Sequence, residues 1–242
     1  MLPHRCSTGT KLAFGKAVNR AKLPRWRPAR KVRRSWPILI VATLLASVGC
    51  SSVDRSRALD NPAVPAEAIA RQVCGNCHGT AGRSVSPNFP NLAGQVRDYL
   101  IEELMDFRAR NRRDPAAIDY MWGMAHGLTD VQILGLAEYF SRQRPAASVR
   151  ADEGMTAVGR RIYERNFPDK DVPACGSCHG VKGEGSEQFP RLAAQHADYL
   201  IKQIQVFKKT DERPDGAVTR QKAHDLSPAE TEAVSVYLQS LP

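Results

Sequence analysis

Two short stretches of the sequence, Cys74-Gly-Asn-Cys77-His78 and Cys175-Gly-Ser-Cys178-His179, share a pattern of two cysteines followed at once by a histidine. Cysteines three residues apart lie on one face of a short helical turn, where their thiols can form thioethers to the two vinyl groups of one porphyrin. The histidine that follows can then bind the iron from one side. The pattern predicts two covalently attached haem c groups, with His78 and His179 as axial ligands.

Paired cysteines have three other common uses. A four-cysteine zinc site would join both pairs, but zinc ribbons bring their pairs closer together and need no histidine after each. A thioredoxin-type centre needs a βαβ context, which the sequence does not indicate. Two disulfides would each close a small strained loop of the kind found in redox catalysts. The histidine after each pair favours haem c over all three.

The sequence around these motifs is repeated. Residues 89–107 and 189–207 are identical at ten of nineteen positions when the chain is shifted by 100 residues. Such self-similarity indicates two homologous domains, which we expect at residues 63–143 and 151–242. The linker at 144–150 is short and contains a proline, so the two domains should lie close together.

Both repeats are predicted to be helical. Apolar residues recur at helical spacing from Gln95 to Phe107, and residues 195–207 largely repeat this pattern. Thr129-x-x-Gln132 and Ser227-x-x-Glu230 are capping boxes that predict the start of the last helix in each repeat. No useful stretch alternates with period two, so the sequence predicts an all-α fold. Each domain has only about 85 residues, which makes a small core. A covalently held haem would give its helices an apolar body to pack around.

The first 50 residues differ in composition from the rest. They hold eleven of the 35 Lys and Arg residues and none of the 25 Asp and Glu residues, which leaves 24 basic against 25 acidic side chains in residues 51–242. The net charge of +10 therefore belongs to this leader. The body offers no basic surface for DNA or RNA, so a nucleic-acid partner is excluded.

The leader resembles an export signal. A basic stretch at residues 30–34 precedes an apolar run from Ile38 to Val48, which is too short to span a membrane. The run ends in Leu45-Ala-Ser-Val-Gly-Cys50, similar to the lipobox of bacterial lipoproteins, although Ser47 stands where leucine is usual. We expect residues 1–50 to be the signal, Cys50 to carry the lipid and residues 51–62 to form a tether. Ordinary cleavage and an uncleaved anchor are the alternatives.

The C-x-x-C-H-G motif, the F-P-x-L-A-x-Q segment and the last helix that follows L-[ST], each present twice, resemble the two-haem cytochrome c4 family over essentially all of residues 63–242. The resemblance implies two tandem class I cytochrome c domains, each wrapped around one haem. It also implies a periplasmic carrier that exchanges electrons with partners such as a terminal oxidase or a respiratory dehydrogenase. We expect it to be monomeric and held at the membrane by its lipid.

The family pattern also implies further ligands. In class I cytochromes the proline carbonyl of a P-x-L segment accepts a hydrogen bond from the iron-bound histidine, which gives this role to Pro90 and Pro190. The sixth ligand is usually a methionine seven residues before the leucine that precedes the last helix, which points to Met121. Met124 is the rival candidate. Met105 lies in a periodic apolar helix and is expected in the core.

The second repeat departs from this pattern. Thr219 stands where the methionine is expected, and no methionine follows Met155. His224 and Lys222 are candidate sixth ligands of haem 2, and a water-bound or open iron is the third option. Against His224, the first repeat has a histidine at the matching position 126 as well as its methionine, which favours a shared role for the two histidines.

Three functions fit these residues. The leading one is a dihaem electron carrier, in which the protein sets potential, orientation and solvent access. The second is a cytochrome subunit of a membrane-associated dehydrogenase or oxidase. The third is reduction of a small molecule such as peroxide at haem 2, with His224 as the acid/base group. His196, in the second F-P-x-L-A-x-Q segment, is expected at the helix surface or at the contact between domains.

Overall fold

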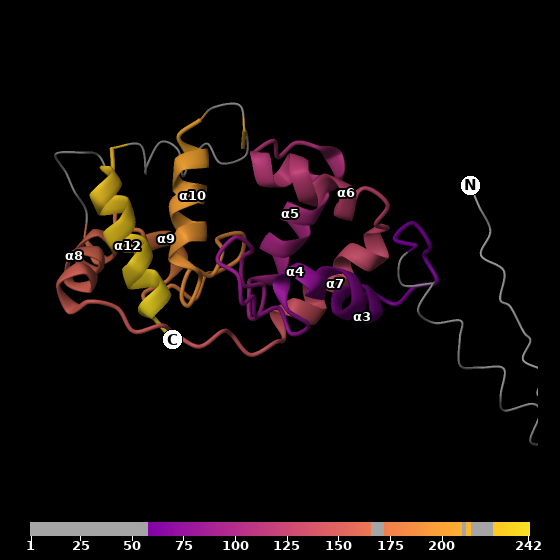
Figure 1. Cartoon of the computed structure of the whole chain (residues 1–242), viewed down its shortest axis with the longest axis horizontal. Coiled ribbons are helices and arrows are strands. Elements are labelled where there is room, and N and C mark those ends of the chain that lie inside the picture. Colours follow the sequence, from indigo (N-terminus) through magenta and orange to yellow (C-terminus); the bar gives the residue numbers. More distant parts are fainter. Residues whose placement is uncertain (1–57, 166–171, 210–211, 214–224) are drawn as a thin grey trace, which may run out of the picture. The chain divides into compact units, whose positions relative to one another are not determined.

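The computed structural model describes residues 58–165, 172–209, 212–213 and 225–242 (Figure 1). All regular elements within these ranges are helical, and the extended pairing seen among them is an isolated bridge between Ser186 and Phe189. The predicted all-α fold is therefore confirmed. None of the described helices is both long enough and apolar enough to cross a lipid bilayer. The described residues belong to one compact unit.

The helical segments of the first repeat begin with an unbroken run that leads into its C-x-x-C-H motif. In chain order they are α3 (Ala66–Ile69), the π-helical turn η1 (Ala70–Cys74), α4 (Gly75–His78), α5 (Arg97–Ala109), the π-helical turn η2 (Ala117–Met121), α6 (Trp122–Ala125) and α7 (Asp130–Ser141). Because α3, η1 and α4 are continuous, the C-x-x-C-H motif is the last turn of one longer helix.

The second repeat follows the same plan. The helices among its described residues are α8 (Glu153–Glu164), α9 (Gly176–His179), α10 (Ala197–Phe207) and α12 (Pro228–Ser240). The last three lie at the sequence positions of α4, α5 and α7 in the first repeat. Met155 lies in α8, the first of these helices.

The last helix of each repeat starts at its predicted cap. Thr129 accepts a hydrogen bond from the Gln132 backbone N–H, and the Gln132 side chain accepts one from the Thr129 N–H. Ser227 and Glu230 form the same reciprocal pair. Both predicted capping boxes are confirmed, so each helix start is fixed by residues within one turn of it.

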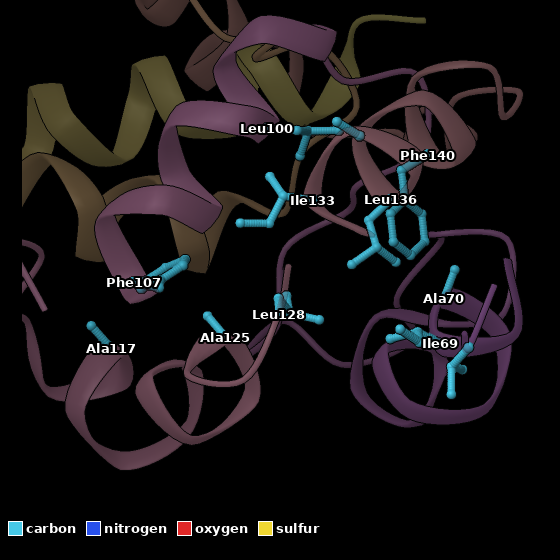
Figure 2. Packing of buried hydrophobic residues seen from close by; sticks show 12 residues of the cluster. Ile69, Ala70, Leu100, Phe107, Ala117, Ala125, Leu128, Ile133, Leu136 and Phe140 are labelled. Atoms are coloured by element: carbon cyan, nitrogen blue, oxygen red, sulfur yellow. The ribbon is translucent and has the colours of Figure 1, made fainter. Parts of the chain in front are cut away.

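Each repeat has its own apolar core. In the first repeat, helices distant in sequence contribute to one buried cluster, shown in Figure 2, which includes Ile69, Leu100, Phe107, Leu128, Ile133, Leu136 and Phe140. The cluster of the second repeat includes Ile162, Tyr163, Leu200, Leu226, Val234, Tyr237 and Leu238. The two clusters have no residue in common, so each repeat buries its own apolar surface.

Met105 lies outside the core, which contradicts the expectation from its helix. Its side chain is 37% exposed. Leu100 and Phe107 are buried in the core, and Leu104 packs against it. Met105 is one residue beyond Leu104, which rotates it by about 100° around the helix axis, away from that face.

Glycine permits a very close helix crossing in the second repeat. Helix α8 packs against α12. A Cβ atom at Gly159 of α8 would lie 2.1 Å from the Ala233 carbonyl oxygen and 2.6 Å from Tyr237 Cβ. The backbones of the two helices can approach to this distance only because residue 159 has no side chain.

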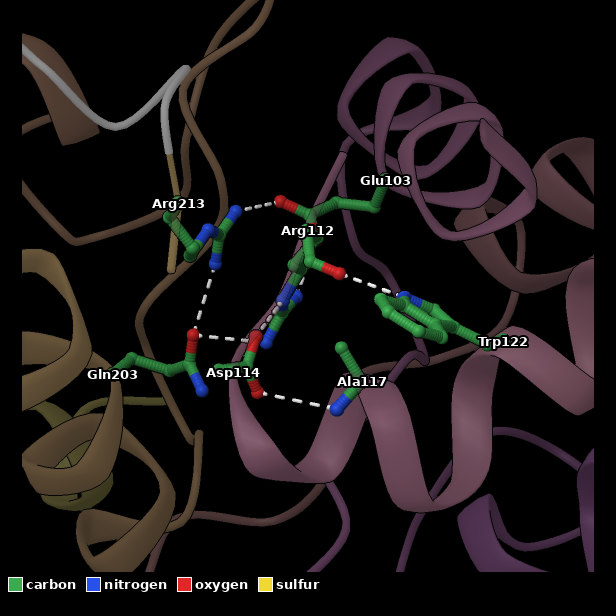
Figure 3. Close-up of polar contacts among 7 residues, drawn as sticks. All are labelled: Glu103, Arg112, Asp114, Ala117, Trp122, Gln203 and Arg213. Atoms are coloured by element: carbon green, nitrogen blue, oxygen red, sulfur yellow. Dashed lines mark hydrogen bonds and ion pairs between the residues drawn. The ribbon is translucent and has the colours of Figure 1, made fainter. Parts of the chain in front are cut away.

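A buried group of charged side chains joins the two repeats (Figure 3). Glu103 of α5 lies between the guanidinium groups of Arg112, in its own repeat, and Arg213, in the other, and accepts hydrogen bonds from both. Asp114 accepts a further bond from Arg112 Nε at 2.5 Å. Gln203 of α10 accepts from Arg112 Nη2 at 3.0 Å and from Arg213 Nη1 at 2.9 Å. We call these five residues the interface cluster.

The charges of the interface cluster compensate one another. Its four charged side chains are at most 11% exposed. Burial by itself would raise the pKa of Glu103, but Arg112 and Arg213 outweigh this effect and hold that pKa below its ordinary value. Two carboxylates therefore face two guanidinium groups, which is the condition for keeping charges away from water.

Candidate haem-binding sites

Each C-x-x-C-H motif forms a single helical turn that stops after its histidine. The next residues, Gly79 and Gly180, have φ of 77° and 82°, a left-handed conformation that glycine adopts without strain. A Cβ atom at Gly79 would also lie 2.2 Å from the Arg83 carbonyl oxygen. The chain therefore turns away sharply, and the histidine lies at the end of its helix.

The two histidines make the same contact. His78 Nδ1 lies 2.9 Å from the Pro90 carbonyl oxygen, and His179 Nδ1 lies 3.0 Å from that of Pro190. A carbonyl oxygen can only accept, so Nδ1 carries the proton and Nε2 has a lone pair available for a metal. Burial lowers the pKa of both imidazoles, although the bond to the proline carbonyl acts in the opposite direction. Both rings are therefore neutral, as metal ligands must be.

An aromatic ring packs edge-on against each histidine. The ring centroids of Phe89 and His78 are 6.0 Å apart, and those of Phe189 and His179 are 5.9 Å apart. Phe89 also lies edge-on to Tyr120, at 5.7 Å. No role was expected for these phenylalanines from the sequence, although their recurrence directly before each proline is a signal for one.

The cysteines of both motifs are free thiols. Burial raises the pKa of Cys74 and Cys175 to about 11. These thiols are thus protonated at neutral pH, unlike the attacking cysteine of a thioredoxin-type centre. Among the residues that the structure describes, no three or more His, Cys, Asp or Glu side chains gather where they could hold a metal ion, so the pairs do not form one zinc site. Two free thiols and one neutral imidazole in each repeat fit haem c.

Met121 and Met124 lie in different environments. Met121 ends the turn η2, is half-buried and packs against the core of the first repeat. The next residue is anchored, because Trp122 Nε1 donates a hydrogen bond to the Arg112 carbonyl oxygen at 2.8 Å. Met124 is 46% exposed. A thioether held at the edge of the apolar core is better placed than an exposed one to bind iron.

The remaining candidate residues fall into two groups. His196 lies at the contact between the repeats, one of its two expected places, where its Nε2 donates to the Ser84 carbonyl oxygen at 3.1 Å. His126 is exposed. The candidates for the sixth position of haem 2 and for lipidation lie outside the described residues: Thr219, Lys222, His224 and Cys50.

The comparison with known families gives two matches along the chain. The cytochrome c family model matches residues 63–142 and again residues 157–242. Each match begins before a C-x-x-C-H motif and ends one or two residues beyond the last helix of its repeat. Two tandem cytochrome c domains imply that the chain binds haem c.

Individual relatives agree with this assignment. Cytochrome c4 of Thiocapsa roseopersicina is 40% identical over 179 residues, covering 72% of this chain and 90% of the relative. The crystal structure of reduced recombinant cytochrome c4 from Pseudomonas stutzeri has a TM-score of 0.66 and 34% identity, covering 73% of this chain and 97% of that chain. The thiosulfate dehydrogenase electron acceptor of Thiomonas intermedia (strain K12) is 33% identical over 185 residues, covering 74% of this chain and 82% of the relative.

The matches extend through both repeats, including their paired cysteines, histidines and prolines. Cytochromes c4 carry electrons and are not enzymes. With two cytochrome c domains in tandem and this degree of identity, the chain belongs to the cytochrome c4 family of dihaem electron carriers.

Proposed function

We propose that the protein is a periplasmic carrier in which the pairs Cys74/Cys77 and Cys175/Cys178 each hold one haem c through thioethers. His78 and His179 bind the two irons through Nε2. The contact of each Nδ1 with a proline carbonyl, at 2.9 and 3.0 Å, carries the proposal, because it fixes in both repeats the tautomer that offers Nε2 to a metal.

When bound, haem c supplies a one-electron couple of iron. The chain supplies the surroundings that decide how this couple behaves. Its proline carbonyls orient the imidazoles, and Phe89 and Phe189 support the rings edge-on. Cys74 and Met121 pack against the apolar cluster of the first repeat, and Cys175 packs against that of the second. These clusters would shield a bound haem from water and so disfavour the more highly charged ferric iron.

The two sites are unequal in the proposal. Met121 is the sixth ligand in the first repeat, supported by its burial against the core. Thr219 at the matching place offers no thioether. Haem 2 therefore has His224, Lys222 or water in the sixth position and titrates at a lower potential than haem 1, because a thioether favours ferrous iron.

The number of haems per chain tests whether each cysteine pair holds one haem c. We expect two haem c per chain from the pyridine haemochrome spectrum and from the intact mass of the mature protein. Cys77→Ser should leave the first haem singly attached or lost, while the second survives, because each repeat has its own site. A mass that fits one haem or a zinc ion would contradict the assignment.

Replacing each of the two candidate methionines by alanine tests the choice of sixth ligand in the first repeat. Wild-type ferric protein should show the weak far-red charge-transfer band of iron–thioether coordination. Met121→Ala should abolish the whole band, because no methionine follows Met155 in the second repeat. Met124→Ala is the matched control and should keep the band, since that side chain is exposed. A band that survives in Met121→Ala would refute the choice of ligand.

The location and the partners follow from the leader and the relatives. Lipidation of Cys50 would hold the carrier at the membrane, and Cys50→Ser should then move it from the membrane fraction to the soluble one. The relative named as an electron acceptor of thiosulfate dehydrogenase supports a dehydrogenase as the electron donor. Reduction of the ferric protein by a purified thiosulfate dehydrogenase with thiosulfate tests this donor. No faster reduction than with thiosulfate alone would exclude it and leave other respiratory dehydrogenases or a terminal oxidase.

A further inference from the structure

The peptide group between Pro90 and Asn91 takes part in two hydrogen bonds that come from different repeats. Its carbonyl oxygen accepts from His78 Nδ1 at 2.9 Å, within the first repeat. Its N–H donates to Gln195 Oε1 of the second repeat at 2.8 Å. Gln195 Nε2 donates in return to the Asn91 carbonyl oxygen at 2.9 Å. One side chain of the second repeat thus holds the peptide that contacts the histidine of the first.

The same arrangement occurs with the repeats exchanged. The peptide between Pro190 and Arg191 accepts from His179 Nδ1 at 3.0 Å and donates its N–H to Gln95 Oε1 at 2.6 Å. Gln95 Nε2 donates to the Arg191 carbonyl oxygen at 3.0 Å. The two glutamines are 100 residues apart and end the F-P-x-L-A-x-Q segment of each repeat. Each glutamine therefore belongs to the segment of its own repeat but is hydrogen-bonded to the peptide of the other repeat.

A hydrogen bond donated by a peptide N–H draws electron density toward the carbonyl oxygen of the same amide. Linked hydrogen bonds polarise one another in this way, by roughly 10–30% per bond, and more effectively where water is absent. Asn91, Gln95 and Gln195 are at most 8% exposed. Each glutamine therefore makes a proline carbonyl a stronger acceptor for a histidine Nδ1–H. A stronger acceptor there makes the imidazole a more basic metal ligand.

We propose that each repeat controls the histidine of the other, with Gln195 as a positioning residue for His78 and Gln95 as one for His179. The inference rests on the proposed role of these histidines as iron ligands. Each glutamine favours ferric iron in the opposite repeat and so lowers its reduction potential. The contact between the repeats thereby sets both potentials and does more than hold the domains together.

The second repeat makes more hydrogen bonds to Asn91 of the first repeat than the first repeat makes to Arg191 of the second. Asn91 Nδ2 also donates to the Ala194 carbonyl oxygen at 2.9 Å, and Asn91 Oδ1 accepts from the Ser84 N–H at 2.8 Å. Arg191 takes the place of this asparagine in the second repeat, and its guanidinium donates instead to the Pro242 carbonyl oxygen. We therefore expect the larger effect at His78.

Two substitutions of Gln195 test the inference in the mature protein with its haems. Gln195→Leu removes the acceptor, so the Nδ1–H resonance of His78 in ¹⁵N-labelled reduced protein should move upfield and the potential of haem 1 should rise. Gln195→Glu retains a side-chain oxygen for the Asn91 N–H and should return both readouts toward or beyond their wild-type values. Gln95→Leu is the matched control, and it should raise the potential of haem 2 more than that of haem 1.

The outcomes separate this inference from a merely structural role. Equal shifts at both haems in Gln195→Leu, or an unmoved His78 Nδ1–H signal, would overturn it, even if the thermal midpoint falls. Readouts in Gln195→Glu that stay at the Gln195→Leu values would also overturn it, because the carboxylate keeps an acceptor for the Asn91 N–H. The haem count of the same samples tests the proposed function separately: fewer than two haems in the wild-type protein would overturn both, whereas two haems with no shift would overturn only this inference.

Discussion

Replacing Glu103 by glutamine should destabilise the protein strongly, although the two side chains have nearly the same shape. The Glu103 carboxylate lies between Arg112 and Arg213, and the three side chains are 11%, 7% and 10% exposed. Removing one partner of a buried ion pair typically costs about 3–5 kcal/mol, because the other charge stays buried without compensation. Arg112 keeps its bond to Asp114 in the variant, so we expect the lower end, about 3 kcal/mol.

Thermal unfolding of the mature protein, followed by circular dichroism, measures this cost. A loss of about 3 kcal/mol corresponds to a fall in the thermal midpoint of roughly 6–12 °C for a chain of this size. Glu138 provides the matched control, because it also lies between two arginines, Arg97 and Arg142, but on the surface. Glu138→Gln should cost less than about 1 kcal/mol. Equal losses in the two variants would refute the argument from burial.

Two further predictions concern pH and helix packing. The pKa of Glu103 is below its ordinary value of 4.5 in the folded protein, so its contribution to stability is fully present above that pH and is lost as the pH falls toward the folded-state pKa. The difference in unfolding free energy between wild type and Glu103→Gln should therefore be constant from pH 7 to about 5. Below pH 4.5 it should shrink by about 1.4 kcal/mol per pH unit. A difference that is unchanged at pH 3 would contradict this. Gly159→Ala should cost about 1–3 kcal/mol, because its Cβ would meet Ala233 and Tyr237. Gly123→Ala, with no atom within 4 Å of its Cβ, should not lower the urea midpoint, and equal losses would contradict the close crossing.

Features that depend on residues close together in the chain could be predicted from the sequence. The capping boxes span four residues, and the C-x-x-C-H motifs span five, so local spacing alone fixes their geometry. The internal repeat predicted two similar units. The family resemblance added the hydrogen bond between His78 and the Pro90 carbonyl. Helical periodicity located α5 to within two residues.

The contacts between the repeats were decided only by the tertiary structure. Glu103 and Arg213 are 110 residues apart, and Asn91 and Gln195 are 104 apart. Periodicity indicates which face of a helix is apolar, but it does not indicate which other segment packs against the helix. From the sequence alone, Glu103 would therefore be expected to be an ordinary surface carboxylate. Met105 was misplaced for a related reason, since its apolar character alone does not give its angle around α5. A charged or amide side chain becomes buried only when a second element brings the charge or peptide that replaces water, and that element here comes from the other repeat.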